Sequence, residues 1–87
     1  MADVHLPPTL PPLYPGLPRR LELQAATVEE LLAALDARWP GLRDRLCEPG
    51  PTLRRHIHVF VDGERAALDT ALPARSRVDV ITAISGG

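Results

Sequence analysis

The stretch VDVITAISGG, residues 78–87, decides the fold that we predict for this chain. Its alternation predicts a β-strand that runs up to Ile84, with Val78 and Val80 facing the core. Two glycines follow, and glycine offers no packing surface and loses much conformational entropy on ordering. We therefore expect a last strand followed by a thin tail that presents the α-carboxylate of Gly87 to another protein.

The composition indicates one small domain, residues 1–87, with a flexible tail over residues 84–87. A chain of 87 residues buries only about 60–65% of its unfolded surface, so a deep internal active site is not expected. The net charge of −1 argues against nucleic acid or an anionic membrane as a partner. The single cysteine, Cys47, excludes an internal disulfide, and no membrane-spanning or signal-peptide pattern is present. These features predict a cytoplasmic protein.

All ten basic side chains are arginines, and the chain contains no lysine. A GC-rich genome is the simpler explanation, since the two residues replace each other on most exposed faces. The alternative is that a protein with an activated C-terminus avoids offering its own side-chain amines as acceptors. The sequence leaves both explanations open.

The first half of the chain predicts two strands and one helix. Residues 3–6 and 20–24 alternate as strands, and the proline-rich residues 7–18 between them exclude a helix and a central strand. Thr27 is a predicted helix N-cap, with Glu30 placed to complete a capping box. The apolar stripe that follows ends at Pro40-Gly41 and comprises Val28, Leu31, Leu32, Leu35 and Trp39.

The second half predicts a short helical turn and two more strands. Residues 42–47 should pack one turn on the core with Cys47 as a buried thiol, and residues 48–51 form a turn. Residues 56–61 give the strongest strand pattern, which Asp62-Gly63 ends as a hairpin-type turn. With the last strand, the pattern predicts an α+β fold in which one main helix covers one face of a mixed, four- to five-stranded sheet.

Three other patterns have weaker functional interpretations. The PxxP spacings within residues 7–18 are compatible with SH3-like recognition, although a stiff connecting loop is the favoured interpretation. The helix start at Thr27 has acidic neighbours that would repel phosphate, so nucleotide binding there is disfavoured. His5, His56 and His58 lack further ligands at metal-site spacing, so no metal site is predicted.

The assembled pattern resembles the ubiquitin-like sulfur carriers of the MoaD/ThiS family, which have the β-grasp fold. The resemblance rests on the strand at residues 4–6, the helix start at 27–31, VFVDG at 59–63, the last strand from Val78 and the terminal Gly86-Gly87. Two departures stand out: TAIS at residues 82–85, where prolines and an alanine are common, and Asp62 in place of asparagine. Residues 39–55 are similar to the longer carriers of the cysteine-biosynthetic type.

The resemblance implies a protein that is a co-substrate and not an enzyme. An E1-like adenylyltransferase/sulfurtransferase would adenylate the C-terminal carboxylate with ATP, and a sulfur donor would convert it into a thiocarboxylate. A biosynthetic enzyme would then accept the sulfur, while the carrier itself binds no cofactor and is a monomer when free. The reactive residues are then Gly86 and Gly87, and the residues expected to bind the partners are Phe60, Ile81, Ala83, Ile84 and Ser85.

The Phe60 and Ile81 assignments also follow from alternation, because the neighbours of these residues face the core and leave both on the open sheet face. Arg54, Arg55, Arg75 and Arg77 are candidates for a charged rim around them or for solvated surface. Three other functions remain open: a small subunit of a molybdopterin-synthase-type complex, a ubiquitin-like protein modifier, or an interaction module whose glycines are incidental.

Overall fold

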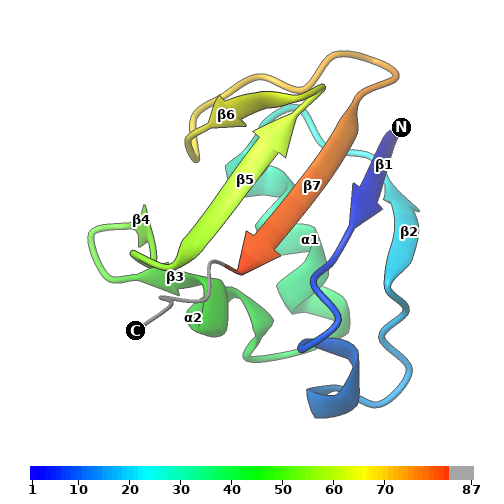
Figure 1. Ribbon diagram of the computed structural model, residues 1–87, viewed down its shortest axis with the longest axis vertical. Helices are drawn as coiled ribbons and strands as arrows, with labels where there is room; N and C mark the ends of the chain where they lie inside the picture. Colours follow the sequence, from blue (N-terminus) through cyan, green and yellow to red (C-terminus); the bar gives the residue numbers. More distant parts are fainter. Residues whose placement is uncertain (83–87) are drawn as a thin grey trace.

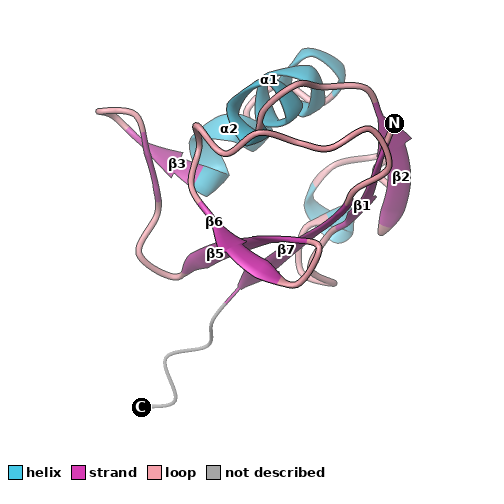
Figure 2. Cartoon of the chain, turned by 90° about the horizontal axis from the view of Figure 1, so that it is seen from above, coloured by secondary structure: helices cyan, strands magenta, loops and turns pink. Residues whose placement is uncertain are grey.

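The computed structural model describes residues 1–82, which form a two-layer α+β unit around one core (Figure 1). Five strands make a mixed sheet in the order β2 (Arg20–Leu23), β1 (Ala2–His5), β7 (Arg77–Thr82), β5 (Ile57–Val61) and β6 (Glu64–Ala66). In this sheet β1 and β7 are parallel and the other neighbours are antiparallel. Both helices lie on the same side of this sheet (Figure 2). This is the ubiquitin-like β-grasp arrangement, and it confirms the predicted fold class.

The elements have the following bounds: β1 Ala2–His5, 3₁₀ helix η1 Pro11–Leu13, β2 Arg20–Leu23, α1 Val28–Arg38, α2 Leu42–Leu46, β3 Cys47–Glu48, β4 Thr52–Leu53, β5 Ile57–Val61, β6 Glu64–Ala66 and β7 Arg77–Thr82.

The start of α1 confirms the predicted Thr27 cap. The Thr27 hydroxyl accepts a hydrogen bond from the Glu30 amide at 3.2 Å. Two further amides of the first turn, those of Val28 and Glu29, donate to the carbonyl groups of Thr70 and Leu68. The first amides of a helix have no acceptor within the helix, and here the loop before β7 supplies two such acceptors.

A side chain near the end of α1 caps the start of α2. Asp36 accepts hydrogen bonds from the amides of Gly41 and Arg43 at 3.0 and 3.1 Å, so a side chain of α1 caps the next helix. Gly41 has a φ of +96°, which favours glycine and explains why the chain turns at Pro40-Gly41. Trp39 is half-buried, with the Arg38 guanidinium 4.7 Å from the centre of its ring.

The core lies between the helices and the inner face of the sheet. The predicted helix stripe is buried there except for Trp39, and so are the inward residues of β5 and β7 and two leucines of the proline-rich loop. The largest fully buried apolar side chains are Leu31, Leu32, Leu35, Leu42, Leu46, Val4, Val28, Val59 and Val78.

Two sequence expectations need correction. The proline-rich loop contains the 3₁₀ helix η1, whereas the prolines predict that no helix forms there. A 3₁₀ turn tolerates prolines at its first positions, because the amides at these positions have no partner within the helix. The hairpin β3–β4 and the strand β6 were not predicted as strands. The strands β3 and β4 have two residues each and β6 has three. Pairing with neighbouring strands, and not the composition of these short segments, makes them strands.

Within residues 1–82, no helix has the length and apolar character needed to cross a bilayer.

Candidate functional site

The candidate site is the end of β7 and the outer sheet face beside it. β7 is the central strand, and it pairs with β1 over Arg77–Asp79 and with β5 over Val78–Thr82. Thr82, the last residue that the structure describes, lies opposite Ile57 at the start of β5. The expected site residues Ala83, Ile84, Ser85, Gly86 and Gly87 lie outside the described residues.

Phe60 and Ile81 both lie on the sheet face that points away from the helices. Phe60 pairs with Asp79, and Ile81 pairs with His58, so the two apolar residues are diagonal neighbours on adjacent strands. Ile81 is 44% exposed, as predicted, whereas Phe60 is partly buried and is therefore less exposed than predicted. The structure therefore brings these two predicted residues together beside the end of β7.

Polar side chains surround this apolar pair on the same face. Arg77 binds Asp79 at 3.0 Å, and an Arg65 Nη2 lies 2.9 Å from the Nδ1 of His58. Of the predicted rim arginines, Arg77 is thus paired within the sheet. Arg54 donates two hydrogen bonds to the Asp44 carbonyl, while Arg55 and Arg75 are exposed.

A second polar cluster on this face joins β1 to β2. Arg20 donates to both carboxylate oxygens of Asp3 at 3.0 Å, and the His5 ring lies 3.1 Å from the same carboxylate. Hydrogen bonding by Arg20, and then by His5, lowers the pKa of Asp3 below its ordinary value. The cluster therefore stabilises the ionised form of this carboxylate.

The three histidines do not meet. His5 is on β1 and His58 is on β5, with β7 between the two strands. Among residues 1–82, no group of three or more histidine, cysteine, aspartate or glutamate residues could hold a metal ion.

Cys47 is buried and free, as predicted. Burial raises the pKa of its thiol, although Arg43 and Arg54 act in the opposite direction. The thiolate is the reactive form of cysteine, so this environment disfavours nucleophilic chemistry at Cys47.

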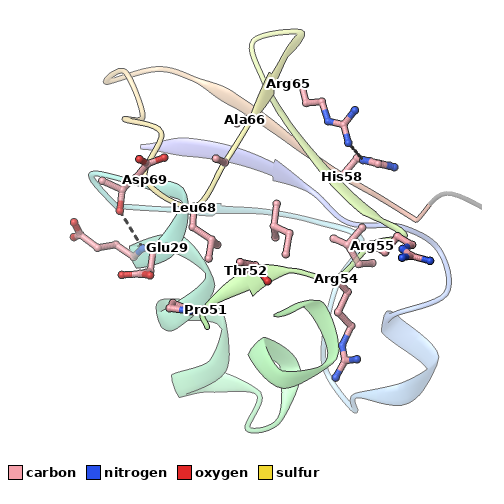
Figure 3. A pocket seen from close by; sticks show the side chains of 15 residues that line it. Glu29, Pro51, Thr52, Arg54, Arg55, His58, Arg65, Ala66, Leu68 and Asp69 are labelled. Carbon is pink, nitrogen blue, oxygen red and sulfur yellow. Dashed lines mark hydrogen bonds between the residues drawn. The ribbon is translucent and has the colours of Figure 1, made fainter. Parts of the chain in front are cut away.

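A hollow of about 850 Å³ is lined by His58 and Arg65 of the sheet, by the start of α1 and by the segment before β5 (Figure 3). It opens between the start of α1, the β3–β4 hairpin and the β5–β6 hairpin. Carboxylates such as Glu29 and Asp69 line one side, and arginines such as Arg55 and Arg65 line the other (Figure 3). Sequence reasoning missed this cavity because it did not predict β6. The Asp62-Gly63 turn was the available signal, since a two-residue turn implies a returning strand.

Comparisons with known proteins place the chain in a family. The model of the ThiS family matches residues 13–87. The fold is similar to that of a chain in the crystal structure of the BexX/CysO complex from Amycolatopsis orientalis, with a TM-score of 0.87, 25% identity and full coverage of both chains. SAMP1 from Haloferax volcanii has a TM-score of 0.76 and 30% identity, with coverage of 99% of this chain and 98% of that one.

CysO from Mycobacterium tuberculosis shares the fold with a TM-score of 0.85 at 23% identity, covering 97% of this chain and 100% of that chain. No curated protein sequence matches the chain.

Proposed function

This chain belongs to the ThiS family of ubiquitin-like carriers, and we propose that it carries sulfur as a thiocarboxylate on Gly87. The observation that carries this proposal is the position of β7. The central strand of the sheet ends at Thr82, and five residues that close with Gly86-Gly87 follow it. The family match extends over this same segment to residue 87.

The proposed chemistry begins with a carboxylate that is an unreactive anion at neutral pH. In the first step a carboxylate oxygen of Gly87 attacks the α-phosphorus of ATP, forms the acyl adenylate and releases pyrophosphate. In the second step hydrosulfide attacks the acyl carbon, so that a C–S bond forms and the C–O bond to AMP breaks. A persulfide donor would instead form an acyl disulfide, which a thiol then reduces to the thiocarboxylate.

The partner enzymes supply the catalytic groups in this scheme. Activation requires an E1-like adenylyltransferase that binds ATP, and this requirement fits the cytoplasm. The acceptor is a biosynthetic enzyme, in keeping with the solved complex of the similar CysO from Amycolatopsis orientalis with BexX. The carrier contributes a recognition surface and a tail without side chains at its last two positions.

We assign the recognition surface to the outer sheet face around Phe60 and Ile81. Exposed apolar side chains that are surrounded by a rim of polar ones are typical of protein interaction sites. Ile81 lies one residue before Thr82, so a partner that holds the tail contacts this face as well. Ala83, Ile84 and Ser85 complete the proposed contact because they connect the sheet to the glycines.

The second candidate function is protein modification through the same activated carboxylate. The observation that favours it is the 30% identity with SAMP1, a small archaeal modifier protein. In that case an amine of a target protein would attack the acyl carbon in place of sulfur and form an amide bond.

Mass spectrometry tests the proposal directly. The chain with a free Gly87 carboxylate is incubated with ATP, an E1-like activating enzyme and sulfide, and the C-terminal fragment is then measured. We expect sulfur to replace one oxygen of Gly87 and the product to react with an alkylating reagent.

The control variants separate this product from oxidation, which adds a similar mass at Met1 or Cys47. Cys47→Ala removes the only other thiol and should keep the alkylated tail, whereas deletion of Gly87 should abolish it. An unmodified tail with several competent activating enzymes would refute the proposal, and amide conjugates to other proteins would favour the modifier.

A further inference from the structure

A polar hollow of about 420 Å³ lies at the same end of the molecule as the end of β7. Figure 1 shows α2, the start of β5 and the end of β7 together at this end. None of the lining residues belongs to the Phe60 and Ile81 surface. They come from the loop after η1, from α2 and its N-cap, and from the segment before β5: Tyr14, Gly41, Asp44, Arg45, Arg54 and His56.

Two guanidinium groups in this hollow are held in place by hydrogen bonds to groups that carry no charge. The Nε and Nη2 of Arg54 donate to the carbonyl oxygen of Asp44 at 3.0 and 2.8 Å. The Nε of Arg45 donates to the Tyr14 hydroxyl at 3.3 Å. Within residues 1–82 neither arginine forms a salt bridge, so each keeps N–H donors and a full positive charge for another partner.

The backbone around these arginines is also fixed. Asp36 caps α2 through the Gly41 and Arg43 amides, and the Arg54 amide donates to the carbonyl of Leu46 at 2.9 Å. The Ile57 amide donates in turn to the Arg54 carbonyl at 2.9 Å. Groups that are already oriented before binding lose less entropy on binding, so this arrangement favours recognition.

The net positive charge of the residues that line the hollow favours binding of an anion. Arg45 and Arg54 contribute two positive charges and Asp44 one negative charge, so the lining is positive overall, in a chain whose net charge is −1. Guanidinium groups bind carboxylate and phosphate oxygens with matched, paired donors. An oxyanion is therefore the ligand that this hollow fits.

We propose that the hollow binds a carboxylate side chain of the protein that holds the tail during activation. This inference rests on the proposed function. His56 lines the hollow and directly precedes Ile57, which pairs with Thr82, so a protein that grips the tail approaches this end. Gly87 lies five residues beyond Thr82, up to about 17 Å along an extended chain. If the tail were fully extended, a nucleotide that reacts with Gly87 would lie about 17 Å from Thr82, so we assign the anion to a side chain of the protein and not to the nucleotide.

Activation kinetics test the proposal with matched variants. The KM of the activating enzyme for the carrier is measured by ATP–pyrophosphate exchange for wild type, Arg45→Gln, Asp44→Asn and Arg75→Gln. We expect Arg45→Gln to raise KM roughly three- to tenfold, because one ion pair at an interface rim is lost. Asp44→Asn should lower KM, because it removes a repulsive charge, while kcat stays unchanged for both.

Arg75→Gln is the control, because Arg75 is an exposed arginine before β7, at the other end of that strand from Ile81 and Thr82, so the structure does not place it in the rim of the Phe60 and Ile81 surface. It should leave KM unchanged. An unchanged KM for both Arg45→Gln and Asp44→Asn would overturn the assignment to a partner carboxylate. A wild-type carrier that no activating enzyme adenylates would instead count against the proposed function.

Titration with small anions tests the hollow independently of activation. Sodium acetate and inorganic phosphate are added to the labelled carrier, and the arginine Nε–H resonances are followed by NMR. We expect saturable shifts at Arg45 and Arg54 that Arg45→Gln abolishes. Shifts with phosphate alone, together with unchanged KM values, would show a site for a free anion and contradict the partner carboxylate. Equal, unsaturable shifts of all arginines would exclude a site.

Discussion

Ser76 shows how a single polar atom limits the stability of this small core. Its side chain is 2% exposed, and its hydroxyl has no hydrogen-bond partner among residues 1–82. A buried polar group without a partner costs free energy, because water satisfied it in the unfolded chain. We expect Ser76→Ala to raise the free energy of unfolding by about 1 kcal/mol, measured by urea denaturation.

Thr70 supplies the matched control for this prediction. Its hydroxyl accepts a hydrogen bond from the Ala67 amide at 2.9 Å, so Thr70→Ala deletes a hydroxyl that is satisfied. This variant should lose stability. A loss of stability in Ser76→Ala as well would mean that its hydroxyl has a partner in solution.

Asp3 makes the stability of the sheet depend on pH. Arg20, and then His5, lower the pKa of this carboxyl in the folded chain. A group with a lowered folded pKa stabilises the fold above its unfolded pKa, and this contribution is lost as the pH falls through the folded value. The urea midpoint of Asp3→Asn should therefore lie below that of wild type at pH 7, and the two should converge in acid.

The partly exposed Asp3 side chain keeps this effect small, because solvent screens surface ion pairs. The Arg20→Gln variant should reproduce the loss at pH 7. A midpoint difference that persists at acidic pH would assign the effect of Asp3→Asn to packing and not to charge.

Among the elements, the β5–β6 hairpin depends most directly on its turn. Val61 pairs with Glu64 across two central residues, Asp62 and Gly63, whose φ angles of 51° and 85° are both positive. This combination is typical of a type I′ turn, which matches the twist of the strands. The turn also reaches β7, because the Asp62 carboxylate accepts a hydrogen bond from the Arg77 amide at 2.8 Å.

Gly63→Ala tests the contribution of this turn. Within residues 1–82, no atom outside the residues that adjoin Gly63 lies within 4 Å of an added Cβ, so the cost is conformational and not steric contact with a neighbour. We expect a loss of about 1–2 kcal/mol in the free energy of unfolding, the usual cost of a left-handed conformation for a residue with a Cβ.

Asp62→Asn is the control in the same turn. Asparagine tolerates positive φ and keeps an oxygen that can accept from the Arg77 amide, so its stability should stay close to that of wild type. Equal stability of Gly63→Ala and wild type would mean that the hairpin adopts another turn in solution.

At the scale of the whole molecule, the α-amine of Met1 lies far from the end of β7, where the tail begins. The chain has no lysine, and the α-amine of Met1 donates to the Ala74 carbonyl at 2.7 Å. Ala74 precedes β7, whose six residues extend about 20 Å to Thr82. The five residues after Thr82 reach about 17 Å, so Gly87 does not reach this amine in an extended path along the sheet.

We therefore predict that the activated carrier does not acylate itself. After incubation with ATP and the activating enzyme, without a sulfur donor, denaturing mass spectrometry should show no cyclised chain and no lysine-linked polymer. An Arg55→Lys variant places an amine near the end of β7 and should form the first internal amide. A self-acylated product of the wild-type chain would contradict the prediction.

Much of the fold could be predicted because its residues carry local signals. Thr27 caps α1 through its own hydroxyl, the stripe from Val28 to Leu35 has helical spacing, and β5 alternates strictly. The strands β3, β4 and β6 carry no comparable signal, because two or three residues cannot establish a period. Phe60 was placed on the correct face by alternation, but its partial burial depends on neighbours from β6 and β7 that alternation does not describe.

The sequence by itself determined the class of fold, the inward residues, the closing Gly86-Gly87 and the resemblance that the family match confirms. Capping, alternation and helical spacing are local properties, so a single chain reveals them. Only the tertiary structure decided that β7 lies at the centre of the sheet, between β1 and β5, and that Arg45 and Arg54 share one hollow with His56. These pairings join residues far apart in the sequence, and the free energy of burying one common core selects them.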